Sequence, residues 1–227
     1  MKKQYHLDLE KFSVEKFKTS LQKREMIPSR VILKEEMENR FKILDSNGIK
    51  TLKALIRVLG TKQKIEIFSD QTGLSTEYLT ILKREAKSFL PNPIHLKKFP
   101  GIDAETIEAL ETIGIKNTKQ FFTKVTIGKG IEQISKRTGV CADKLNELAS
   151  LSDLARLYGV GPVFARMIYD TGIDSVEKFV QYSAGEFIEI YENKTQKKAD
   201  FRETDINLSI DLAKQILTEE SAACETR

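Results

Sequence analysis

Apolar residues along this chain recur at the three- and four-residue steps of amphipathic helices, and alternating strand patterns are nearly absent. The first apolar stripe predicts a helix from Ser13, its cap, to about residue 24, before Pro28 stops it. A longer helix is expected from Ser29 to Asn47. Further helices are predicted at residues 52–59, 62–71, 75–89, 94–99, 104–113, 118–125, 130–138, 142–151 and 206–217. The pattern indicates an all-α fold.

One helix-ending pattern occurs three times: a glycine, an apolar residue and, after one more position, a capping residue. The copies begin at Gly48, Gly114 and Gly172, and each glycine is expected in the left-handed conformation that ends a helix. The spacing from Gly48 to Gly114 equals the spacing from Gly73 to Gly139. Two landmarks with one period indicate stacked supersecondary units, each too small to bury its apolar face alone.

Tight turns precede two of these copies. Gly101 precedes Gly114 by the same spacing as Gly159 precedes Gly172. The later turn reads Tyr158-Gly159-Val160-Gly161-Pro162, in which proline suits the first turn of the next helix. A helix, a Gly-x-Gly turn and a second helix form a helix-hairpin-helix pattern. We therefore predict tandem helix-hairpin-helix-like (SAM-like) repeats of short helices, with structural turns at Gly48, Gly73, Gly101, Gly114, Gly139 and Gly172.

The strongest break in the chain is Leu90-Pro91-Asn92-Pro93, because two closely spaced prolines exclude a continuous helix. The predicted parts are an N-terminal helical segment at 1–30, a first degenerate repeat at 31–90, two further repeats at 91–217 and a flexible tail at 218–227.

The composition, 40% hydrophobic and 31% charged, is that of an ordinary soluble protein. The net charge of +4 is uneven, since residues 1–64 carry 16 Lys and Arg against 8 Asp and Glu. Such asymmetry can mark a polyanion-binding face. However, lysine and glutamate alternate closely in residues 34–40, which favours a solvated helical face. Glu219 and Glu220 are also interpreted as solvated charge.

No signal for catalysis, a metal or a cofactor emerges from the sequence. Cys141 and Cys224 lack CxxC spacing, and His6 and His95 lie far apart. We therefore expect no enzyme activity, no cofactor and no small-molecule substrate. No stretch approaches the roughly 20 apolar residues of a membrane span, and the charged N-terminus has no apolar region behind it. A cytoplasmic protein is the expectation.

The run from Phe99 to Leu110, which continues to Gly114-Ile115, resembles the helix-hairpin-helix domains of DNA repair proteins and RecA-like recombinases. The tandem arrangement, with Thr72-Gly73-Leu74 and Thr138-Gly139-Val140 as turns between hairpins, is similar to a bacterial family, domain of unknown function family 4332, over about residues 30–217. This resemblance implies all-helical tandem repeats and supplies no established activity.

The third copy is the candidate binding site. Glycines let the main chain turn tightly, so that N–H groups of Gly159, Val160 and Gly161 can face a phosphate, and Arg166 follows on the next helix. The alternative is that this turn only packs helices together.

The other two copies look structural. In the second, Glu105 and Glu108 would repel a phosphate, and Asp103 is expected to cap the helix. In the first, Glu35 stands where a turn glycine is expected. The sequence favours a non-catalytic binding module whose ligand is nucleic acid, above all DNA, without sequence specificity. A protein–protein interaction scaffold is the alternative.

Overall fold

The computed structural model describes residues 4–225, which form an all-helical protein. Within this range the only extended pairings are two isolated bridges, Ser13 with Thr51 and His95 with Asn117. The predicted all-α class is therefore confirmed. The chain forms two compact units, the first spanning Leu7–Leu90 and the second combining residues 4–6 with the chain from Pro91 onward. The boundary between the units falls at the start of the proline-rich segment.

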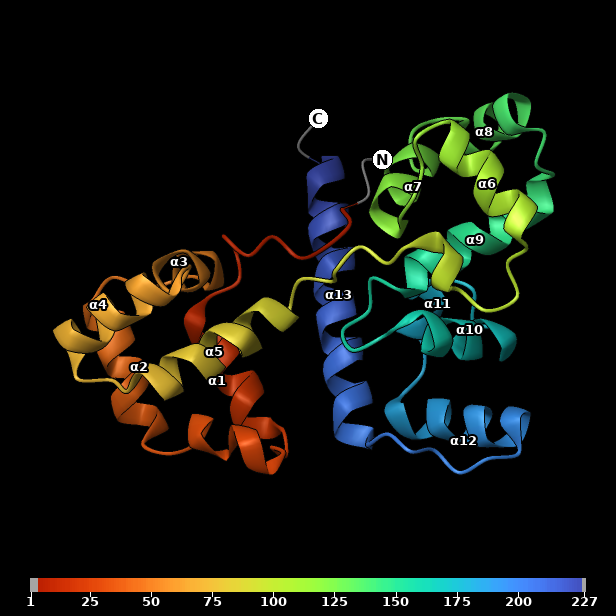
Figure 1. Ribbon diagram of the computed structural model, residues 1–227. Helices are drawn as coiled ribbons and strands as arrows, with labels where there is room; N and C mark the ends of the chain where they lie inside the picture. Colours follow the sequence, from red (N-terminus) through yellow and green to blue (C-terminus); the bar gives the residue numbers. More distant parts are fainter. Residues whose placement is uncertain (1–3, 226–227) are drawn as a thin grey trace. The chain divides into compact units, whose positions relative to one another are not determined.

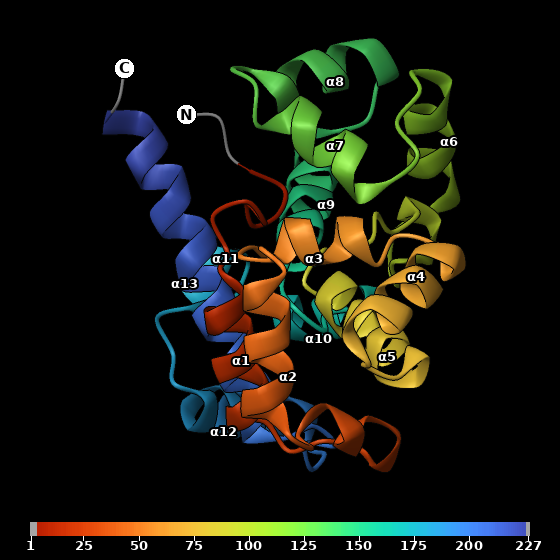
Figure 2. The same cartoon turned by 90° about the vertical axis from the view of Figure 1, so that its left-hand side faces the viewer.

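The first unit packs its helices around α5 and α1 (Figures 1 and 2). Ser13 caps α1 by accepting the N–H of Lys16, as predicted. The buried carboxylate of Glu85 on α5 holds the guanidinium groups of Arg24 and Arg30 at 2.7 and 2.5 Å. The elements are α1 (Val14–Lys23), the 3-10 helix η1 (Pro28–Leu33), α2 (Met37–Ser46), α3 (Leu52–Val58), α4 (Lys62–Thr72) and α5 (Thr76–Ser88).

The continuous helix expected from Ser29 to Asn47 is wrong. It is broken into η1 and α2 at Glu36, which has the left-handed backbone of φ 44°. Burial of both Leu33 and Met37 favours this break, and the guanidinium of Arg40 donates to the carbonyl of Ile32 at 2.7 Å. The first unit thus keeps a turn before α2 although it lacks the glycine that makes this turn elsewhere.

The second unit is a stack with α6, α7 and α8 at one end and α12 at the other, and α13 runs along it (Figures 1 and 2). Helix α9 packs against α7, α8 and α10, and α13 packs against α11 and α12. The elements are the 3-10 helix η2 (Leu96–Lys98), α6 (Ala104–Thr112), α7 (Thr118–Val125), α8 (Gly130–Thr138), α9 (Ala142–Leu154), α10 (Pro162–Asp170), α11 (Val176–Phe179), α12 (Ala184–Thr195) and α13 (Glu203–Glu225).

The end of the chain differs from the expected flexible tail at 218–227. Helix α13 does not stop at residue 217 but continues through Glu225, and residues 226–227 lie outside the described part. Glu219 and Glu220 are buried, so their interpretation as solvated charge is also wrong. Burial of Glu220 is offset by an ion pair with the buried guanidinium of Arg156 at 3.0 Å.

The helices recur at the spacings that the sequence predicts. Both ends of α5 precede the ends of α9 by the same spacing that separates Gly73 from Gly139. The same holds for α6 and α10. The first and last residues of α10 follow those of α6 by the spacing from Gly114 to Gly172. Gly73 and Gly139, which end α4 and α8, have φ of 73° and 75°. Helix ends therefore recur at one spacing between the two units, from α5 to α9, and at another within the second unit, from α6 to α10.

Gly114 shows how these helix ends are built. Its φ of +80° lies in the left-handed region, and its N–H donates to the carbonyl of Glu111 at 3.0 Å. The N–H of Ile115 then reaches back to the carbonyl of Leu110 at 3.0 Å, which completes a Schellman motif. This backbone turns the side chain of Ile115 into the core, where only 2% of the residue is exposed.

We predict that Gly114→Ala lowers the free energy of unfolding by about 1 kcal/mol or more, because a Cβ is strained at positive φ. No atom lies within 4 Å of the added Cβ, so a steric clash does not contribute. Gly185→Ala is the control, since Gly185 lies inside α12 at ordinary φ with open space around it. It should leave stability equal or raise it. Denaturant unfolding measures both variants, and a Gly114→Ala protein as stable as Gly185→Ala would contradict this account.

Candidate functional site

The third turn, Tyr158–Pro162, joins α9 to α10. Gly159 is exposed with φ +77°, and Gly161 is the residue before α10, in an extended conformation. No atom lies within 4 Å of a Cβ built on either glycine, so both positions have room for a side chain. Val160 differs from expectation, since its side chain is buried and its N–H donates to the carbonyl of Leu157 at 3.2 Å. Its amide is therefore engaged within the protein.

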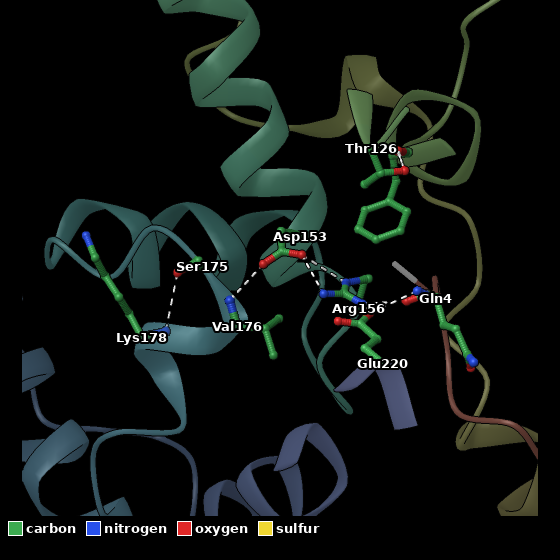
Figure 3. Close-up of polar contacts among 9 residues, drawn as sticks. Gln4, Thr126, Asp153, Arg156, Ser175, Val176, Lys178 and Glu220 are labelled. Carbon is green, nitrogen blue, oxygen red and sulfur yellow. Dashed lines mark hydrogen bonds and ion pairs between the residues drawn. The ribbon is translucent and has the colours of Figure 1, made fainter. Parts of the chain in front are cut away.

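A buried arginine fixes the chain just before this turn (Figure 3). The guanidinium of Arg156 donates to one carboxylate oxygen of Asp153 at 2.6 and 3.0 Å, and to Glu220 of α13 at 3.0 Å. It also donates to the main-chain carbonyl of Gln4 and lies 4.5 Å from the centre of the Phe122 ring. Its side chain is fully buried. One cation thus joins the N-terminal segment, α9 and α13.

Asp153 extends this network to α11. Its second carboxylate oxygen accepts the N–H of Val176 at 2.8 Å, at the first residue of that helix (Figure 3). Burial by itself lowers the pKa of Arg156, but the carboxylates of Asp153 and Glu220 outweigh it and raise that pKa above its ordinary value. This network was not predicted. The only local signal for it is the spacing of three between Asp153 and Arg156 on a helical segment.

Arg166, which the sequence places in the candidate binding site, does not present a free charge to solvent. Only 14% of its side chain is exposed, and it pairs with Glu147 at 2.6 Å. Its Nε donates to the carbonyl of Pro100 at 2.8 Å, and its guanidinium lies against Gly101 in the second turn. Arg166 therefore holds the second and third turns together, which leaves it poorly placed to bind a phosphate.

The second turn, Phe99–Asp103, carries its own anion. The carboxylate of Asp103 accepts the N–H of Thr106 at 2.8 Å, so the predicted capping role is confirmed. Lys144 contacts the same carboxylate at 3.0 Å. The backbone hydrogen bond from Thr106, with the contact from Lys144, lowers the pKa of Asp103 to about 2. The start of α6 is thus already occupied by a negative charge, whereas no side chain caps α10.

A pocket of about 640 Å³ adjoins the third turn. Gly159 and Val160 line it together with side chains of α10 and of the segment that leads into α13. Its walls include five aromatic residues: Tyr158, Phe164, Phe179, Tyr191 and Phe201. The pocket was not predicted, because residues 192–205 look like a polar connection in the sequence. Phe201 nevertheless lies within them and packs against Phe164 at a ring-centre distance of 4.9 Å.

Other candidate chemistry is sparse in the described part of the chain. Residues 4–225 contain no group of three His, Cys, Asp or Glu side chains that could hold a metal ion. Cys141 is a free, exposed thiol, and the side chain of Cys224 lies outside the described part. Across the same residues, no helix combines the length and apolarity that a membrane crossing needs.

Residues 100–216, just over half of the chain, match the family described as Domain of unknown function (DUF4332). The chain belongs to this family. The match covers α6 to α12 and most of α13, including both turns and Arg156, whereas the expected resemblance began near residue 30. Comparison with curated proteins and with solved structures gives no match. Membership in DUF4332 therefore places the chain in a family and assigns it no activity.

We predict that Arg156→Met lowers the free energy of unfolding by roughly 3–5 kcal/mol, because it leaves Asp153 and Glu220 buried without their cation. Lys178→Ala is the matched control, since it removes an exposed ion pair with Asp174 from the same unit. That change should cost at most about 0.5 kcal/mol. Urea unfolding followed by circular dichroism compares the two. Equal losses would show that the buried network contributes no more than a surface pair.

A second prediction concerns the pH dependence of α6. The pKa of Asp103 falls from its ordinary 3.8 to about 2, so its carboxylate stabilises the fold above pH 3.8 and this contribution disappears as the pH falls through 2. Titration of the Asp103 carboxyl by NMR should give a midpoint near 2. In Lys144→Ala the midpoint should move upward but stay below 3.8, because the Thr106 hydrogen bond remains. A midpoint at or above 3.8 in the parent protein would contradict the capping geometry.

Proposed function

We propose that this chain is a non-catalytic binding module built from helix-hairpin-helix-like repeats, and that its third turn binds nucleic acid without sequence specificity. The repeat type is supported by the common spacing of the helices and by left-handed glycines at the second and third turns, Gly101 with φ +81° and Gly159 with φ +77°. In this proposal the ligand's phosphate lies at the start of α10, near the amide of Gly161.

The proposal rests on a difference between the second turn, before α6, and the third turn, before α10. At α6, the carboxylate of Asp103 occupies the helix N-terminus. At the equivalent point of α10, Gly161 offers no side chain, and Pro162 follows it. The positive end of the helix dipole and the unbonded amides of the first turn together favour an anion there. The open turn is therefore the better phosphate site of the two.

Cations near the open turn come from a different segment than expected. Arg166 is committed to Glu147 and Pro100, so we exclude it from the proposed contact set. Lys197 and Lys198 are exposed and line the same pocket as Gly159. We infer that these lysines supply the attraction to phosphate that the sequence assigned to Arg166.

A protein-interaction scaffold is the second candidate, and Val163 favours it. This residue lies in the first turn of α10, lines the aromatic pocket and is 56% exposed. An apolar protein interface would bind with little dependence on salt, whereas phosphate binding weakens steeply as salt rises, through counterion release. Salt dependence therefore separates the two candidates.

The variant Gly161→Asp tests the nucleic-acid proposal. It copies the second turn by placing a carboxylate before α10, where the extended backbone and the open space accept an aspartate. Stability should stay equal or rise slightly, because aspartate is a good helix cap. Binding to a short DNA duplex should weaken by about tenfold or more, the equivalent of one charge-assisted hydrogen bond. Fluorescence anisotropy at low and moderate salt measures the loss and its dependence on charge.

Gly161→Asn is the matched control, since asparagine can cap the helix without adding charge. It should weaken duplex binding less than Gly161→Asp does. If Gly161→Asp binds the duplex as tightly as the parent protein, the third turn is not the phosphate site. If the parent protein binds neither a duplex nor a single strand even at low salt, the nucleic-acid proposal fails and the scaffold remains.

A further inference from the structure

The aromatic pocket beside the third turn has the size of a small-ligand site. Its volume of about 640 Å³ lies within the range of roughly 300–1,000 Å³ that such sites occupy. It is continuous with the open backbone of Gly159, and residues between 197 and 209 form another part of its lining. A ligand that contacts the turn can therefore extend directly into the pocket.

The walls of the pocket favour a flat ligand. Phe201 contacts Phe164 and Tyr191 at ring-centre distances of 4.9 and 5.0 Å, which fixes its own ring. Phe164, Phe201 and Tyr158 each keep part of their surface exposed. Ordered, partly exposed rings are the surfaces on which the bases of single-stranded nucleic acids stack.

A buried hydroxyl in the pocket wall lacks a partner. Ser209 of α13 lines the pocket with 2% of its surface exposed, and its Oγ makes no hydrogen bond with any described residue. Buried polar atoms are nearly always hydrogen-bonded, so an unpaired one beside a pocket points to a ligand group.

The rim carries both signs of charge. Lys197 and Lys198 are exposed on it, and so are Asp200 and Asp205. Lysines bind a phosphate, while aspartates accept the N–H groups that a nucleobase presents. A ligand with only an anionic group and a hydrocarbon body would face two carboxylates with no donor to offer them. A nucleotide offers a phosphate to the two lysines and base N–H groups to the two aspartates.

We propose that this pocket binds one nucleotide unit, with its base against Phe201 and Ser209 and its phosphate toward Lys197, Lys198 and the third turn. The proposal deepens the nucleic-acid function above and rests on it for the phosphate contact. The nucleotide can belong to a single strand or be free in solution. A duplex cannot supply it intact, because its bases are stacked and paired. The protein should therefore bind a single strand more tightly than a duplex.

The test measures three probes with the full chain: a short labelled single strand, the matching duplex, and adenosine 5′-monophosphate by calorimetry. Ser209→Ala should weaken binding of the single strand by about three- to tenfold, the effect of one neutral hydrogen bond. Phe201→Leu keeps apolar volume but removes the flat ring, and it should weaken the same probe. Neither variant should change duplex binding.

Ser152→Ala is the matched control. Ser152 of α9 is also fully buried with an unpaired hydroxyl, but it does not line the pocket. Removal of either hydroxyl should leave the melting temperature unchanged or slightly raised, and only Ser209→Ala should affect binding. If the single strand binds and adenosine 5′-monophosphate does not, the ligand is a nucleotide within a strand. If adenosine 5′-monophosphate also binds, a free nucleotide is enough to occupy the pocket.

These measurements separate binding of a base in the pocket from binding of a phosphate at the third turn. If single strand and duplex bind equally, and Ser209→Ala and Phe201→Leu behave like Ser152→Ala, the pocket does not take a base. Loss of that binding in Gly161→Asp would then still support the third turn as a phosphate site. If none of the three probes binds at low salt, both proposals are overturned.

Discussion

The fold depends on one local constraint, a left-handed glycine followed by an isoleucine that must be buried. Ile49, Ile115 and Ile173 follow Gly48, Gly114 and Gly172, and each isoleucine is only 2% exposed. The glycine lets the chain reverse at the end of a helix while the next side chain points into the core. A capping residue then starts another helix two positions later: Thr51, Asn117 or Ser175. Repetition of this constraint produces the same succession of helices in both units.

The third glycine-isoleucine copy differs from the other two in one hydrogen bond at the start of the next helix. The buried network around Arg156 is a consequence of this difference. In the first two copies, the N–H groups of Leu52 and Thr118 donate to the carbonyls of Phe12 and Ile94. In the third, the N–H of Val176 donates instead to the carboxylate of Asp153. A buried carboxylate needs a cation, which Arg156 supplies. Because a guanidinium has five N–H donors, Arg156 also binds Glu220 and Gln4, and this contact holds the end of α13 in place.

The parts of this structure that could be predicted are those with a local cause. Gly114 and Ser13 act on their neighbours along the chain, so helix ends and the common spacing follow from the sequence. The break at Glu36 has no such signal, because a glutamate rarely adopts a left-handed conformation and tertiary packing of Leu33 and Met37 imposes it. The burial of Glu220 depends on Arg156, which is far away in the sequence. The third turn of the candidate site could be predicted from its glycines. The pairing of Arg166 could not be predicted, because its partners Glu147 and Pro100 approach it only in the folded chain.

Arg166 makes its contacts within the second unit, so the proposed phosphate site uses other residues. Its guanidinium spans from α10 to the carbonyl of Pro100 and to Glu147, so its charge is balanced within the protein. A phosphate at the start of α10 would have to compete with Glu147 for this cation. The N-terminus of α10 has no such competitor, because Gly161 carries no side chain. In the proposed binding mode, an anion at this turn would contact the main chain together with Lys197 and Lys198, which line one pocket with Phe201 and Ser209.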